Sequence, residues 1–81
     1  MDIIEQIDKW NKGLKYPYRM APSLHFDRKL IMLTDGHKTL MISNYHLKHF
    51  EFTISIPKSI VHQGSEKKGN LKTILREFHA L

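Results

Sequence analysis

The chain has 81 residues, which is enough for one domain with a single modest core, so we expect one domain over residues 1–81. It contains no cysteine, which excludes disulfides and thiolate chemistry, and no apolar run approaches the length of a membrane span. The formal net charge is +5, with 13 lysines and arginines against 8 acids. These totals predict a soluble, cytoplasmic protein that does not enter a membrane and whose partner carries negative charge.

Residues 2–13 have the pattern of an amphipathic helix. Asp2 and Glu5 have the spacing of a capping box, and Gly13 is a natural stop. Apolar residues recur at helical spacing between them, namely Ile3, Ile7, Trp10 and Leu14. The following residues 14–23 contain two prolines and predict a loop or an extended connection.

The period then changes to two, which indicates strands. Residues 28–43 predict two strands joined by a tight type I′ turn at Asp35-Gly36. Residues 30–33 are all apolar, so we expect that strand to be central and covered on both faces. A third strand over 49–56 alternates and ends at a proline, with one face made of Phe50, Phe52, Ile54 and Ile56.

The C-terminal part reads as a polar loop, containing Gly64, Ser65 and Gly69, followed by a helix that Asn70 would cap. The apolar stripe of that helix comprises Leu71, Ile74, Leu75, Phe78 and Leu81. The predicted fold is therefore a small α+β domain with the order α-β-β-β-α, in which a three-stranded antiparallel sheet is packed by two helices.

Positive charge is concentrated in residues 9–29 and 58–76, a distribution that suits a polyanion or an acidic protein. Two tyrosines lie between cations in the first stretch and would stack on bases if exposed, or pack against the core if not. The second stretch brings lysines and free N–H groups to a helix N-terminus, a place that attracts phosphate. The residues expected to contact nucleic acid are Tyr16, Tyr18, Arg19, Lys48, Lys67, Lys68, Lys72 and Arg76.

Histidine is the usual acid–base group at neutral pH, and RNA cleavage without a metal needs such a base beside cations. His46 lies next to Lys48 and His49, which makes it the best candidate for a catalytic base, and His25 is the other. We expect no metal and no cofactor. The side chains of His46 and His49 would diverge in an extended segment, and no cysteine or carboxylate cluster completes a ligand set.

The C-terminal stretch from Ile54 resembles the end of HicA-type (YcfA-like) toxins, which close with a strand ending in proline, a polar loop and a Lys-Gly-Thr-Leu-like turn that opens a final helix. The matching positions are Ile54, Ile56, Pro57, Lys68, Gly69, Leu71, Ile74 and Leu75, with Asn70 where threonine is typical. The resemblance implies a double-stranded-RNA-binding-like fold, messenger RNA cleavage by one histidine, and an antitoxin that covers the site. The Gly-Ser-His-like triplet of the family is absent, and Asn44-Tyr45-His46 and Ser23-Leu24-His25 are the two places where its histidine would lie.

Three functions follow as hypotheses. The first is an RNA-binding protein that is also a metal-independent endoribonuclease, the toxin of a toxin–antitoxin pair. The second is a non-enzymatic inhibitor or regulator of the phage or mobile-element type, which binds a protein or nucleoprotein partner through its basic surface. The third is a structural interaction domain that pairs through a sheet edge or a helix.

Overall fold

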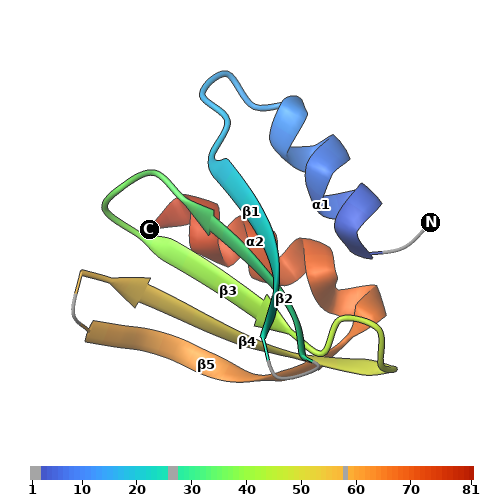
Figure 1. Cartoon of the computed structure of the whole chain (residues 1–81). Coiled ribbons are helices and arrows are strands. Elements are labelled where there is room, and N and C mark those ends of the chain that lie inside the picture. The colour runs from blue at the N-terminus through green and yellow to red at the C-terminus, as the bar shows by residue number, and fades with distance from the viewer. Residues whose placement is uncertain (1–2, 26–27, 58) are drawn as a thin grey trace.

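The computed structural model describes the backbone of residues 3–25, 28–57 and 59–81, and the side chains of these residues outside 21–29. Helices lie at both ends of the described chain, with the strands between them (Figure 1). In chain order, the elements are α1 (Ile3–Lys12), β1 (Arg19–His25), β2 (Arg28–Thr34), β3 (Thr39–Ser43), β4 (His49–Ile56), β5 (Ser59–Lys67), the short 3-10 helix η1 (Lys68–Asn70) and α2 (Leu71–Ala80).

The sheet has five antiparallel strands in the order β1-β2-β3-β4-β5, so the expected three-stranded sheet is wrong, although the domain is α+β. The two additional strands are the edges. β1 contains Pro22, which an edge strand tolerates because only one side of it pairs with a neighbour. β5 is exposed at nearly every residue, so it has no alternation of apolar and polar side chains to reveal it. Both edges are defined by backbone pairing with β2 and β4.

The β2–β3 hairpin lies where the sequence predicts it, but its turn spans residues 35–38 and is not a two-residue type I′ turn. Gly36 has a φ of 91°, the left-handed conformation that glycine tolerates, whereas Asp35 has a negative φ. The Asp35 carboxylate accepts hydrogen bonds from the backbone N–H groups of His37 at 2.8 Å and Lys38 at 2.9 Å. These two N–H groups lower the pKa of the Asp35 carboxyl below its ordinary value.

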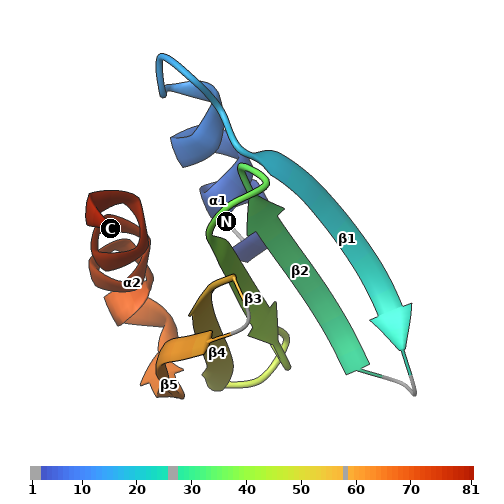
Figure 2. The ribbon, with the colours of Figure 1, turned by 90° about the vertical axis from the view of Figure 1, so that its left-hand side faces the viewer.

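Both helices pack on the same face of the sheet, which curves around them (Figure 2). The inward-facing residues of β2, β3 and β4 alternate with outward-facing ones, as the period of two requires. Leu30 and Met32 lie on the face without helices and are partly exposed, so the expectation that β2 is covered on both faces is wrong. The buried apolar core comprises Ile3, Ile7, Tyr18, Ile31, Leu33, Leu40, Ile42, Phe50, Phe52, Ile54, Leu71, Ile74, Leu75 and Phe78.

The two helices follow their predicted stripes closely. α1 matches the predicted helix, with the proposed cap Asp2 outside the described residues. In α2, four of the five predicted stripe residues are buried, whereas Leu81 is 54% exposed after the helix ends. Asn70 stands at the N-cap position, but its side chain makes no cap hydrogen bond and instead donates to Glu66 Oε2 at 2.7 Å. In the part of the chain that is described, neither helix is long and apolar enough to cross a membrane.

The ends of α1 and α2 are joined by a polar network that we term the tied end, made of Asn11, Tyr18, Lys38 and His79. The Asn11 side chain accepts from the Tyr18 N–H and donates to the Tyr18 carbonyl, both at 2.8 Å. The Tyr18 hydroxyl is 2.6 Å from His79 Nδ1. Lys38 Nζ donates to the carbonyls of His79 at 2.9 Å and Leu81 at 2.8 Å, so a cation meets the negative end of the α2 dipole.

Candidate nucleic-acid interface

Several predicted site residues gather at the opposite end of the helical layer. We term this region the basic end and define it by Lys48, Lys67, Lys68 and Lys72 with the neighbouring His46 and His49. His49 and Lys67 are directly paired across β4 and β5, so their Cβ atoms lie roughly 5 Å apart on one face. Lys48 immediately precedes β4, and Lys68 begins η1, which leads into α2. The register of β4 and β5 thus brings Lys48, which precedes His49, near Lys67.

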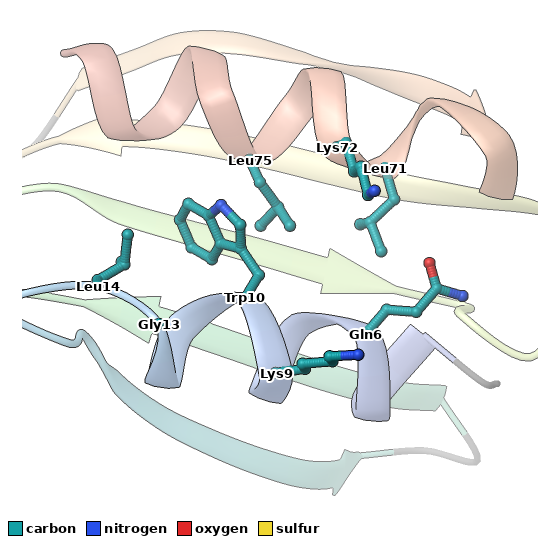
Figure 3. A pocket seen from close by; sticks show the side chains of 8 residues that line it. All are labelled: Gln6, Lys9, Trp10, Gly13, Leu14, Leu71, Lys72 and Leu75. Atoms are coloured by element: carbon teal, nitrogen blue, oxygen red, sulfur yellow. The ribbon is translucent and has the colours of Figure 1, made fainter.

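The helices add to the positive potential at this end. α1 and α2 run in the same direction, so both begin on the same side of the molecule, as the labelled residues of Figure 3 show. Each helix N-terminus carries a partial positive charge, which the Glu5 carboxylate offsets in the first turn of α1, whereas the first turn of α2 contains no acid. Lys72 lies in the first turn of α2, and Arg76 follows one turn later on the same exposed face.

Two acids that neighbour these lysines in the strand pair β4–β5 accept hydrogen bonds from neutral side chains. Glu66 accepts the hydrogen bond from Asn70, and Glu51 Oε2 accepts one from Asn44 Nδ2 at 3.2 Å. The ion pair of Lys12 with Asp8 at 2.9 Å, and the contact of His62 Nδ1 with Glu77 Oε2 at 3.2 Å, lie elsewhere. The exposed cations at or near this end form no ion pair with another described residue, namely Lys48, Lys67, Lys68, Lys72 and Arg76. The same holds for the exposed Lys9, Lys15 and Arg19 elsewhere.

Of the two predicted catalytic histidines, only His46 has a described side chain. His46 is exposed in the β3–β4 turn and makes no hydrogen bond with another described residue, so nothing orients its imidazole. His49, three residues later, is also exposed. The side chain of His25 lies outside the described residues. The geometry therefore provides an imidazole beside cations but no second group that holds it as a general base.

The predicted stacking segment is not part of the basic end. Arg19 pairs with Thr34 at the far end of the sheet, and Tyr16 precedes it in the loop after α1, where it is 78% exposed. The ammonium of Lys15 lies 5.6 Å from the centre of the Tyr16 ring. Tyr18 is not available for stacking on a base, because its side chain is only 8% exposed and packs against Trp10 and Phe78, which is the core position that the sequence left open as the alternative.

The structure also reveals a groove between the helices that the sequence reading missed, lined by Gln6, Lys9, Trp10, Gly13, Leu14, Leu71, Lys72 and Leu75. Trp10 and Leu14 appear in the sequence as members of a core stripe, and no local signal separates a core residue from one that lines a groove.

Among the described residues, no three histidine, cysteine, aspartate or glutamate side chains cluster as metal ligands. No protein-family model matches the chain, and no curated protein or solved structure is significantly similar to it.

Proposed function

We propose that the protein binds RNA and that the lysines of the basic end contact its phosphates. The observation that carries this proposal is the group of lysines from a turn, a strand end and a helix start that have no acidic partner among the described residues. Such cations release condensed counterions when they meet a phosphate backbone, which supplies most of the sequence-independent affinity. The preference for RNA is supported by the resemblance of the C-terminal stretch to RNA-cleaving toxins.

Binding through phosphates has a measurable dependence on salt. For single-stranded RNA, each phosphate contact contributes a slope of about −0.7 to log K against log salt, so four lysines give roughly −3. The probe is a labelled single strand of about 12 nucleotides, read by fluorescence anisotropy between about 50 and 200 mM salt. A deoxy strand of the same sequence tests the choice of sugar, because equal affinity for both strands would contradict a preference for RNA.

A matched pair of double variants tests the location of the site. Lys67→Glu with Lys68→Glu removes two cations of the basic end, and Lys15→Glu with Arg19→Glu makes the same change in net charge at the far end of the sheet. We expect the first pair to weaken binding at least about tenfold and to reduce the magnitude of the slope by about 1.4, because two phosphate contacts are lost. The second pair should cost less than about threefold. Equal losses, or no binding by the unaltered protein at low salt, would contradict the proposal.

RNA cleavage is the second candidate function, favoured by the position of His46 in the turn that also carries Lys48. His46→Ala should then abolish the cut product while the anisotropy titration is unchanged, because the imidazole takes a proton and does not provide the affinity. His49→Ala is the matched control in the same region. If the unaltered protein leaves RNA intact in the absence of metal, the nuclease function is excluded and the toxin resemblance loses its support.

The non-enzymatic alternative uses the same lysines differently. An inhibitor that covers an acidic surface of another protein would tolerate both histidine substitutions but would lose its partner with Lys67→Glu and Lys68→Glu. The side chain of Leu47, which immediately precedes Lys48, is 49% exposed and suits a protein contact better than a phosphate contact. Binding to RNA that is unaffected by the double variant, together with loss of a protein partner, would favour this alternative.

A further inference from the structure

The groove between α1 and α2 has a volume of about 640 Å³ (Figure 3). Leu71 and Leu75 of α2, which are each 1% exposed, extend into the space between the helices, and Trp10 of α1 extends into it from the other side (Figure 3). A volume of this size is typical of pockets for small ligands, which lie between roughly 300 and 1,000 Å³.

The groove is polar at one end and apolar at the other. Figure 3 shows the side chains of Gln6, Lys9 and Lys72 on one side of the Trp10 indole, and Leu14 on the other side. Gln6 and Lys72 extend from opposite helices toward each other. The arrangement therefore presents an aromatic and aliphatic wall that leads to two ammonium groups.

The two lysines make the polar end a place for an anion. Lys9 and Lys72 are exposed, and neither forms an ion pair with another described residue. An anionic group would be attracted by both ammonium groups, and the partial positive charge at the α2 N-terminus acts in the same direction beside Lys72. A cationic ligand would be repelled, and a neutral ligand would gain only the apolar contacts.

The size of the groove favours a small molecule over a protein segment. Eight of the described residues line it, whereas a standard protein interface uses roughly 20 to 30 residues on each side. We propose that the groove binds a small amphiphilic anion, in which a hydrocarbon body contacts Trp10, Leu14 and Leu75 and a single carboxylate or phosphate contacts Lys9 and Lys72. This site is separate from RNA binding and does not depend on it, apart from the shared residue Lys72.

The protein carries its own reporter for this site. Trp10 is the single tryptophan of the chain, so the intrinsic tryptophan emission comes only from the groove. The probe is decanoate below its micelle concentration, compared with decanol and decyltrimethylammonium, which have the same chain length and differ in charge. Decyl phosphate tests whether the anionic group of a lipid headgroup serves as well as a free carboxylate.

We expect decanoate to change the emission of Trp10 in a saturable way, and decanol and decyltrimethylammonium to need at least about tenfold higher concentrations. Lys9→Glu should weaken decanoate binding at least about tenfold, Lys9→Gln should weaken it less, and Lys15→Glu is the matched control outside the groove. Lys9→Glu should leave RNA affinity within about threefold, which separates this proposal from the previous one.

Three results would overturn the proposal. The first is the absence of a saturable emission change with either anion. The second is equal binding of the cationic amphiphile, which would reduce the site to a non-specific apolar surface. The third is displacement of decanoate by an acidic amphipathic helical peptide that binds at lower concentrations, which would make the groove a protein-docking site. Circular dichroism of Lys9→Glu and Lys9→Gln verifies that both variants are folded.

Discussion

Where α1 and α2 end, polar side chains are joined to the sheet by hydrogen bonds, whereas where the same helices begin, lysines face solvent without an acidic partner in the described chain. At the tied end, Lys38 is 7% exposed and Asn11 is 5% exposed, and each satisfies two backbone groups. At the basic end, Lys67, Lys68 and Lys72 are exposed. Buried polar groups that are fully paired contribute to stability, and exposed cations that are unpaired remain available for a ligand.

This comparison predicts that substitutions at the two ends change different measured quantities. At the tied end they should lower the free energy of unfolding, and at the basic end they should lower affinity while changing stability by less than about 0.5 kcal/mol. The Lys67→Glu and Lys68→Glu double variant is therefore the common reference for the stability measurements below.

The largest effect on stability is expected for Asn11→Ala. The substitution removes the partner of both the N–H and the carbonyl of Tyr18, and an unsatisfied buried backbone group costs about 1–3 kcal/mol. We expect a loss of about 3 kcal/mol in the free energy of unfolding, measured by urea denaturation. Lys12→Ala is the control. Lys12 is the next residue of α1 and is exposed, so its substitution should cost less than about 1 kcal/mol. A loss as small as that of the control would mean that water replaces the side chain fully.

A smaller loss, about 2 kcal/mol, is expected for Lys38→Met. Methionine keeps the apolar stem that packs near the Phe78 ring, which lies 5.3 Å from Lys38 Nζ, but it cannot donate to the last carbonyls of α2. The charge also no longer opposes the α2 dipole. Lys15→Met is the matched control at an exposed position. If Lys38→Met unfolds at the same urea concentration and with the same cooperativity as the unaltered protein, the hydrogen bonds of Lys38 to the end of α2 are not needed for stability.

The smallest effect is expected for Asp35→Ala, about 0.5–1 kcal/mol at neutral pH, because the turn that positions Lys38 loses two hydrogen bonds at an exposed site. The folded-state pKa of Asp35 is lowered by the N–H groups of His37 and Lys38, so the ionised carboxylate stabilises the fold above its ordinary value of 3.8. That stabilisation is lost as the pH falls through the lower folded-state pKa.

Urea unfolding of both proteins at neutral pH and near pH 2.5 tests this sign, since the difference between them should shrink in acid. A difference that is constant across this range would contradict the assignment of the carboxylate as the group that holds the turn.

The sequence predicted the exposure of the cationic site residues, because exposure of a lysine or arginine depends little on the fold. Lysines in polar segments are exposed in almost any fold, and Lys48, Lys67, Lys68, Lys72 and Arg76 are all exposed here. The sequence did not predict that Tyr18 is buried, because the Asn11 side chain and the Trp10 ring that hold it depend on how α1 meets β1. The groove was missed for the same reason, since its two walls come from helices at opposite ends of the chain.

The sequence by itself determined α1, β2, β3, β4 and α2, because each of them buries an apolar face whose period is visible within about ten residues. Only the tertiary structure decided the edge strands β1 and β5, the capping role of Lys38, and the placement of cations from distant segments at one end. Edge strands are held by backbone hydrogen bonds to a neighbour and need no side-chain pattern of their own. The cations meet because β4 and β5 pair in one register, and contacts between residues so far apart in the chain leave no local trace.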